Sequence, residues 1–352
     1  MKKIISIMLC VLIILFCPIY AYAQTEEIIS EIDIEHEMTS AEIDEFLLTA
    51  RPISDLVSSE DKPIEEKIDS SLDRNGSYKY DAKTKQVTFE SAENINLYNA
   101  RAEEKTESIS FGVDSEYFPK NINVSEEIGG ISTFGIIGDD NRTRVKDTTK
   151  GPWCNTVRLL MKINGNNYVG SGFMIGPNSV ATAGHCVYSK SNGWASSITV
   201  IPAVNGTSKP YGTATMTSME CGGNWYKDEN NQDDWGIIRV NKNIGKSTGW
   251  LGLRWQSASY NNQYLYANGY PAEYPNYMYY GYGKVTSCSA RTIVGNWDLS
   301  GGQSGGPVFK YIADYGYCAV GINRGGSSTY SDCLRIDEWI FNKFMSFRTK
   351  TA

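Results

Sequence analysis

Histidine is nearly absent from this sequence: only His36 and His185 occur among 352 residues. Because these two histidines are not four residues apart, the sequence contains no HExxH motif, and it cannot build a metal site of three or more histidines. The sequence also shows no carboxylate loop of the EF-hand type, no low-complexity tract and no convincing internal repeat. Beyond residue 23, no apolar run is long enough to span a bilayer. We therefore expect no metal, no cofactor, no nucleic-acid partner and no stable membrane association once the first segment is removed.

Residues 1–23 have the pattern of a secretory signal peptide. Lys2 and Lys3 precede an apolar run over residues 4–19, and Ala21-Tyr22-Ala23 has the small-x-small form that signal peptidase cleaves. An uncleaved membrane anchor is the alternative, but the run is shorter than the about 20 residues that span a bilayer. The pattern predicts a secreted, extracellular protein.

Charge divides the rest of the chain into two parts. Residues 24–134 carry 26 acidic and 10 basic side chains, whereas residues 135–352 carry 14 acidic and 21 basic ones. The net charges are thus −16 and +7. This asymmetry predicts an acidic propeptide over residues 24–134 that masks a basic domain and is then cut away; a merely solvated tail is the alternative. Within it, residues 78–80 and 86–89 alternate like strands.

Residues 135–352 have the pattern of an all-β domain. Short apolar runs recur between Gly, Asn and Pro residues: Val157 to Ile163, Tyr168 to Ile175, Ser197 to Ile201, Trp235 to Val240, Tyr264 to Ala267, Pro307 to Phe309 and Tyr317 to Ile322. At the end, Asp337 to Met345 has helical spacing of its large apolar residues. The pattern favours a barrel or a sandwich over an α/β plan, without choosing between the two.

Three short stretches carry the chemistry: Thr182-Ala183-Gly184-His185-Cys186, Asp233-Asp234-Trp235-Gly236-Ile237-Ile238 and Gly301-Gly302-Gln303-Ser304-Gly305-Gly306-Pro307. A serine hydroxyl is a poor nucleophile near neutral pH unless a base lies beside it, and imidazole suits because its ordinary pKa is about 6.5. That base needs a carboxylate to fix its tautomer. If His36 leaves with the propeptide, His185 is the only imidazole that remains.

The glycines around Ser304 predict an oxyanion hole. A backbone without Cβ atoms can bend until amide N–H groups converge on a developing negative charge. We expect these donors to be the N–H groups of Gly302 and Ser304. The same residues match the G-x-S-x-G elbow of α/β-hydrolases, but in that fold the histidine follows the serine, and no histidine follows Ser304.

The three stretches resemble the chymotrypsin-fold (trypsin-like) serine proteases, and more narrowly the bacterial branch that contains the glutamyl endopeptidases. The likeness covers roughly residues 135–347 and leaves the propeptide unmatched. It implies a catalytic triad of His185, Asp234 and Ser304, in which Asp234 rather than Asp233 matches because it directly precedes the apolar strand. It also implies two six-stranded antiparallel β-barrels. Together with the residue patterns above, the expected fold is all-β: two such barrels with a C-terminal helix, preceded by the acidic propeptide. Because residues 136–143 resemble the start of mature enzymes in this branch, we expect the processing cut within residues 133–137.

The resemblance leaves the substrate pocket open. Glutamyl endopeptidases bind the acidic side chain with a histidine that follows the nucleophile, and this chain has Asn323 at that position. Asn323 carries no charge, so selectivity for Glu falls unless Arg324 supplies a cation; the alternation of a strand points Arg324 to the other face. Asp298, six residues before Ser304, offers the alternative of trypsin-like cleavage after Lys or Arg.

Six cysteines follow the signal segment: Cys154, Cys186, Cys221, Cys288, Cys318 and Cys333. An even number in an exported chain suggests up to three disulfides. By resemblance, Cys186 is bridged to hold the histidine loop, with Cys154 or Cys221 as partner. Cys318 and Cys333 flank a Gly-Gly turn and could meet across a hairpin.

The sequence therefore predicts a secreted serine endopeptidase that is made as a zymogen, acts on proteins or peptides, needs no cofactor and is monomeric. Its own propeptide is the expected intramolecular mask. A catalytically silent binding or adhesion module is the alternative from another class, and a lipase or esterase is disfavoured by the order of the three stretches.

Overall fold

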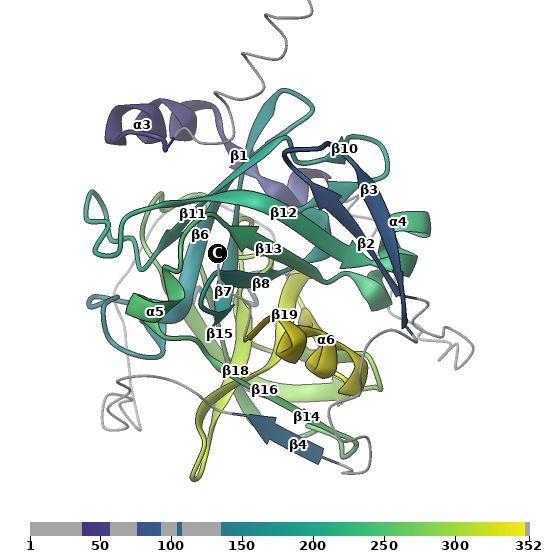
Figure 1. The fold of residues 1–352 in the computed structure, drawn as a ribbon. Helices are drawn as coiled ribbons and strands as arrows, with labels where there is room; N and C mark the ends of the chain where they lie inside the picture. Colours follow the sequence, from purple (N-terminus) through teal and green to yellow (C-terminus); the bar gives the residue numbers. More distant parts are fainter. Residues whose placement is uncertain (1–36, 57–75, 93–103, 108–134, 349–352) are drawn as a thin grey trace, which may run out of the picture. The chain divides into compact units, whose positions relative to one another are not determined.

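The computed structural model describes residues 37–56, 76–92, 104–107 and 135–348 (Figure 1). The predicted signal peptide lies outside these residues, and so do residues 133–134 of the predicted processing site. Within the described ranges, no helix combines the length and apolar character needed to cross a membrane.

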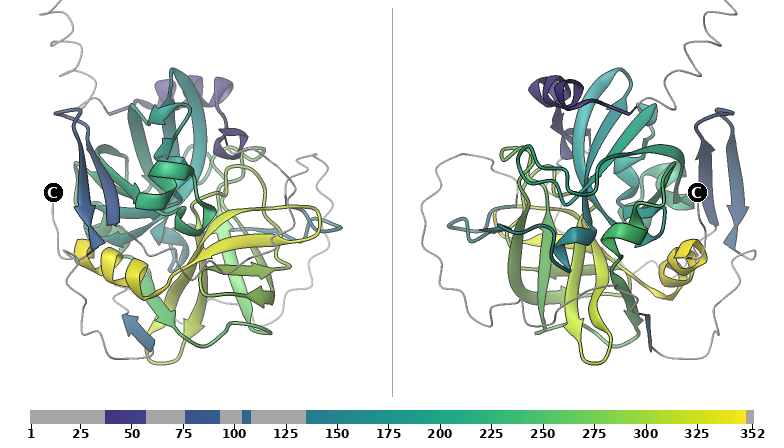
Figure 2. Two further views of the ribbon diagram at one scale, coloured as in Figure 1. Left: turned by 90° about the vertical axis from the view of Figure 1, so that its right-hand side faces the viewer. Right: turned by 60° about the vertical axis from the view of Figure 1, so that its left-hand side comes forward.

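Two closed antiparallel β-barrels of six strands each make up the protein, as the resemblance implied (Figure 1; Figure 2). The first barrel consists of β6 (Thr156–Ile163), β7 (Asn166–Gly176), β8 (Ser179–Thr182), β13 (Gly236–Val240), β12 (Ala214–Gly222) and β11 (Ser197–Pro202), and pairing of β11 with both β12 and β6 closes it. The second consists of β15 (Tyr264–Gly269), β16 (Tyr279–Cys288), β17 (Thr292–Gly295), β20 (Ser331–Arg335), β19 (Gly316–Gly326) and β18 (Pro307–Ile312), and β18 closes it by pairing with β15 and β19.

The strands of the first barrel are mostly apolar, and their side chains are buried in its core. β6 and β7 are paired over eight positions, and nearly all their residues are buried. Burial of this apolar area is the main favourable term in the stability of such a core. All seven predicted strand runs fall on strands of the two barrels.

The predicted C-terminal helix is confirmed as α6 (Glu338–Arg348), which packs against β7 and β8 of the first barrel and against β14. Its apolar side meets Trp235, whose ring lies 5.4 Å from Trp339 and 6.2 Å from Phe344. The other elements of this part are short: β5 (Thr143–Arg144), β9 (Tyr188–Ser189), β10 (Gly193–Trp194), β14 (Gly252–Gln256), α4 (Gly223–Asp228), α5 (Gly245–Thr248), and the 3₁₀ turns η4 (Trp153–Asn155), η5 (Gly184–Cys186) and η6 (Asn231–Asp233).

The segment predicted to be the propeptide adds strands to both barrels. It contains α3 (Ser40–Thr49), β1 (Arg51–Pro52), the turn η1 (Ile53–Leu56), the hairpin strands β2 (Gly76–Asp81) and β3 (Val87–Ser91), and β4 (Glu104–Glu107). β1 pairs with β7, β2 with β12 and β4 with β14, as Figure 1 shows. The two strands predicted at residues 78–80 and 86–89 are β2 and β3.

The expected disulfides are absent: all six cysteines of the described residues are free thiols. Cys333 pairs across the ladder with Asn323, five residues from Cys318 on the same strand. At about 3.3 Å per residue this separation far exceeds the about 7 Å that a disulfide can bridge. Cys186 instead directs its thiol to the carbonyl of Ser304 at 3.7 Å, and Cys154 directs its own to the carbonyl of Thr248 at 3.2 Å.

Candidate active site

Strand pairing in the first barrel brings His185 and Asp234 together. His185 lies in η5 just after β8, Asp234 lies just before β13, and β8 pairs with β13 through Thr182 and Gly236. The Asp234 carboxylate accepts the His185 backbone N–H at 2.8 Å through Oδ1 and contacts the His185 Nδ1 atom at 2.8 Å through Oδ2. Both residues are 2 % exposed.

This carboxylate dominates the protonation of the imidazole. Burial lowers the pKa of His185, but the charge and hydrogen bond of Asp234, together with the nearby Cys186, outweigh burial and raise the pKa well above its usual value. The neighbouring carboxylate has other partners, because Asp233 accepts the indole N–H of Trp235 and the backbone N–H of Asn224, both at 2.9 Å. The structure thus pairs Asp234, and not Asp233, with His185.

Ser304 lies in the loop just before β18 of the second barrel, and its side chain points to a backbone carbonyl. Its Oγ donates to the carbonyl of Arg324 at 3.2 Å. Within the described part of the chain, Nε2 of His185 is buried and has no hydrogen-bond partner. Hydroxyl and imidazole are therefore not hydrogen-bonded to each other here.

Ser171 of β7 joins the Ser304 loop to the first barrel. Its backbone N–H donates to the carbonyl of Ser304 at 2.9 Å. Its hydroxyl donates to the carbonyl of Gly302 and accepts from the N–H of Tyr270, both at 2.8 Å. Nothing in the sequence singled out this serine, because its role depends on a contact between the two barrels.

The backbone around Gly302 leaves two N–H groups uncommitted. The carbonyl of Gly301 accepts from the N–H of Ala272 at 2.8 Å and so points out of the loop. Gly302 has φ +94°, and a Cβ there would lie 2.7 Å from the carbonyl of Tyr270. Among the described residues, the N–H groups of Gly302 and Ser304 donate to no protein acceptor. Both N–H groups are thus available to bind an oxyanion.

All three candidate pocket residues make contacts within the protein, and Asn323 and Arg324 are described first. Asn323 is fully buried and donates through Nδ2 to the carbonyl of Asn268 at 3.2 Å. The guanidinium of Arg324 pairs with Asp332 at 2.8 Å and donates to Thr292 Oγ1 at 3.2 Å. Burial disfavours its charge, but the carboxylates of Asp332 and Asp234 together outweigh burial, so the pKa of Arg324 rises.

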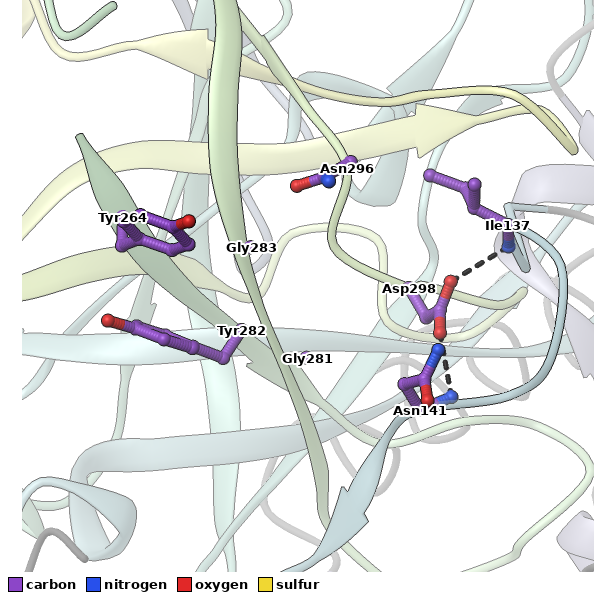
Figure 3. A pocket seen from close by; sticks show the side chains of 8 residues that line it. All are labelled: Ile137, Asn141, Tyr264, Gly281, Tyr282, Gly283, Asn296 and Asp298. Atoms are coloured by element: carbon purple, nitrogen blue, oxygen red, sulfur yellow. Dashed lines mark hydrogen bonds between the residues drawn. The ribbon is translucent and has the colours of Figure 1, made fainter. Parts of the chain in front are cut away.

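Asp298 also has both carboxylate oxygens occupied. Oδ1 accepts the backbone N–H of Ile137 and Oδ2 that of Asn141, each at 2.8 Å (Figure 3). Burial raises the pKa of Asp298, while these two N–H donors act in the opposite direction. The carboxylate lies at one side of a pocket of about 250 Å³, and the rings of Tyr264 and Tyr282 lie at the other. The residues that line this pocket do not include His185, Asp234 or Ser304.

Part of the predicted propeptide lies against the loops that carry His185 and Ser304, which sequence patterns did not reveal. Ile53 is fully buried beside Gly170, at a point that the Cys186 thiol also approaches, and η1 lies against η5. A Cβ on Gly301 would lie 2.8 Å from the Pro52 ring and 2.9 Å from the Ser54 hydroxyl. The β1–η1 segment therefore spans from the histidine loop to the loop before Ser304.

Comparisons with known proteins identify the family. Residues 170–314 match the family model of the trypsin-like peptidase domain. The chain is 32% identical over 226 residues to a glutamyl endopeptidase of Bacillus licheniformis, covering 62% of this chain and 70% of that protein. It is 34% identical over 242 residues to a Bacillus subtilis protein named extracellular metalloprotease, covering 68% of this chain and 75% of that protein. That name is the relative's own: the described residues here contain no group of three or more His, Cys, Asp or Glu side chains placed to hold a metal ion.

A solved glutamyl endopeptidase structure in complex with MPD shares the fold, with a TM-score of 0.54, 24% identity and coverage of 60% of this chain and 98% of that one. The two-barrel architecture rules out the α/β-hydrolase fold of the lipase alternative. The resemblance, the fold and the enzyme class predicted from the sequence are thus confirmed. The chain belongs to the trypsin-like serine peptidases of glutamyl endopeptidase type and is a serine endopeptidase.

Proposed function

We propose that the enzyme cleaves peptide bonds through a triad of Ser304, His185 and Asp234. The observation that carries the proposal is the two-point contact of the Asp234 carboxylate with His185, which fixes the ring and leaves Nε2 as its proton acceptor. Ser304 Oγ turns from the Arg324 carbonyl to Nε2 and attacks the substrate carbonyl carbon. His185 takes the hydroxyl proton, then gives it to the leaving amine.

In this proposal the N–H groups of Gly302 and Ser304 bind the oxyanion of the tetrahedral intermediate. Loss of one such donor reduces kcat by about 10²–10³-fold in enzymes of this chemistry. Water then hydrolyses the acyl-enzyme with His185 acting again as general base. Replacing Ser304 with Ala tests the proposal: a folded Ala variant that still hydrolyses casein contradicts it.

We propose an acidic P1 preference of modest strength. Relatives of glutamyl endopeptidase type support it, and Asp298 is not free to bind a Lys or Arg side chain because both its oxygens accept N–H groups. Asn323 is uncharged and the charge of Arg324 is balanced by Asp332, so selectivity for Glu is expected to be shallower than with a charged ligand. Cleavage of a peptide mixture, read by mass spectrometry, gives the order of Glu, Asp, Lys and Arg at P1.

We propose that residues 24–134 are a propeptide that masks the active site with β1 and η1. Pro52, Ile53 and Ser54 occupy the space between the histidine loop and Gly301, so a substrate chain cannot lie there at the same time. The charges of the two parts, −16 and +7, favour their association.

The hairpin β2–β3 anchors this mask on the first barrel. β2 pairs with β12 over Ser218–Gly222, and the ring of Tyr78 stacks on Tyr226 at 4.0 Å. Glu90 of β3 and Glu220 of β12 both contact the buried ammonium of Lys343. Export through the signal peptide, processing within residues 133–137 and action as a monomer complete the proposal.

A further inference from the structure

The residues at and just after the predicted processing site run along the loop that ends in Ser304. The carbonyl of Gly135 accepts the N–H of Leu299 at 3.0 Å, and the N–H groups of Ile137 and Asn141 bind Asp298. The contacts continue with Arg142, whose side chain is 2 % exposed. A buried guanidinium needs partners for its five N–H donors.

Arg142 finds these partners on two sides. On one side, Nε and Nη2 bind the Asp140 carboxylate at 3.0 and 2.8 Å, and Nη2 also contacts Glu273 Oε1 at 2.8 Å. On the other side, Nη1 donates to Gln303 Oε1 at 3.0 Å and to the hydroxyl of Ser300. The two carboxylates thus fix the guanidinium, and the guanidinium in turn holds the loop.

Gln303 directly precedes Ser304, and its side chain closes the turn that contains Gly302. Gln303 Oε1 accepts the backbone N–H of Ser300 at 3.0 Å, and the N–H of Gln303 donates to the Ser300 carbonyl at 3.1 Å. Arg142 donates to the same Oε1 atom. One oxygen therefore joins the turn to the buried cation.

We propose that Arg142 is a positioning residue for peptide hydrolysis, which holds the Ser300–Gln303 turn so that the N–H groups of Gly302 and Ser304 meet the oxyanion. The inference rests on the proposed role of Ser304. Only a planar fork can bind Gln303 and Ser300 with one edge and the two carboxylates with the other, so Lys does not replace Arg here. Burial disfavours the charge of Arg142, but Asp140 and Glu273 outweigh it and raise its pKa, so the residue stays a cation at working pH.

The test compares Arg142→Lys and Arg142→Met with the processed enzyme of natural sequence, counting active sites by titration with an organophosphonate. We expect kcat per titrated site to fall about 100-fold while KM changes little, because a displacement of about 1 Å in a catalytic group has an effect of this size. We also expect affinity for a peptide boronate to fall with kcat, since the boronate occupies the oxyanion hole, whereas affinity for the product peptide stays the same. If the role of Arg142 is purely structural, the variants will have a lower melting temperature, but their affinities for the boronate and for the product peptide will change together.

Arg144→Met is the matched control. Arg144 lies two residues further on, is exposed, and stacks over the Tyr277 ring at 3.9 Å without touching the turn. It is expected to keep kcat within about twofold, as surface changes do.

Gln303→Leu tests the same contact from the other side, and it keeps the inference testable if the Arg142 variants do not fold. It removes the acceptor and leaves the guanidinium with its two carboxylates; we expect the same loss of kcat and, in the double variant with Arg142→Lys, no further loss. Natural kcat per active site in folded Arg142→Lys and Gln303→Leu overturns the inference. Activity that survives Ser304→Ala instead overturns the proposed function.

Discussion

The hydroxyl of Ser304 donates to the carbonyl of Arg324 at 3.2 Å, while Nε2 of His185 has no partner among the described residues. The proposed nucleophile and base are therefore separate groups in a structure where β1 and η1 lie over the loops that carry them. In the proposed mechanism, rotation about the Cα–Cβ bond of Ser304 turns Oγ from the Arg324 carbonyl to Nε2 of His185. If residues 24–134 act as the proposed mask, the precursor already holds His185 and Asp234 paired, and only the contact of Ser304 with His185 has still to form.

The pKa of His185 sets the pH dependence. The imidazole acts as base only when neutral. Burial lowers its pKa, but the charge and hydrogen bond of Asp234, together with the nearby Cys186, outweigh burial and raise the pKa above the ordinary value of 6.5. Activity is therefore expected to fall as pH drops through this raised pKa, with a midpoint of kcat/KM above 6.5. Asp234→Asn removes the charge, so it should lower the midpoint and reduce kcat by about 10⁴-fold.

The measurement is a kcat/KM profile across the acidic and alkaline range for both proteins, with active sites titrated. A midpoint that stays unchanged in Asp234→Asn contradicts the assigned pairing. Asp233→Asn is the companion variant: because Asp233 binds Trp235 and Asn224, it should lose stability without shifting the midpoint.

Gly302→Ala tests the geometry of the proposed oxyanion hole. The position has φ +94°, and the new Cβ would lie 2.7 Å from the Tyr270 carbonyl, so the loop must shift. We expect kcat to fall by about 10²-fold or more, as when one oxyanion donor is lost. Gly212→Ala is the control, because Gly212 has φ +72° but nothing within 4 Å; it should cost about 1–2 kcal/mol of stability and leave kcat unchanged. Equal kcat in both variants would argue against the hole.

Ile53→Asp in the uncut precursor tests the mask. Ile53 is fully buried between the two parts, so a charge there should detach β1 and η1 from the active site. Labelling of Ser304 by an organophosphonate is expected to become at least about 10-fold faster, a change equivalent to about 1.4 kcal/mol in the closing equilibrium. Leu48→Asp on α3 is the matched control, since Leu48 is 86 % exposed. A labelling rate equal in both variants refutes the mask.

Cutting the chain within residues 133–137 is not expected to release the propeptide by itself. The hairpin remains held by its pairing with β12 and by the stack of Tyr78 on Tyr226. Native mass spectrometry should find both pieces together after the cut. Tyr78→Ala should weaken the complex about 10-fold or more, given the usual contribution of an aromatic pair plus its buried area, whereas Val87→Ala at an exposed position should not. Immediate separation of the natural pieces contradicts this anchoring.

Local patterns predicted seven of the twelve barrel strands, the final helix and the three chemical stretches, because each depends on residues close in sequence; they did not reveal β8, β12, β16, β17 or β20. The contact of His185 with Asp234 follows from them once the barrel is known. Patterns could not show that Ser171 and Arg142 brace the Ser304 loop, since both contacts join residues more than 100 positions apart. The expected Cys318–Cys333 disulfide was wrong for the same reason. The strand register places Cys333 opposite Asn323 rather than opposite Cys318.

Mass spectrometry of the processed enzyme after reaction with an organophosphonate tests the central claim most directly. We predict one label, on Ser304, together with loss of peptide cleavage in proportion to labelling. We also predict that the unlabelled enzyme cuts a peptide mixture after Glu in preference to Lys or Arg. Cleavage activity that survives complete labelling of Ser304, or a label that falls on another residue, would contradict the assignment of Ser304 as the nucleophile.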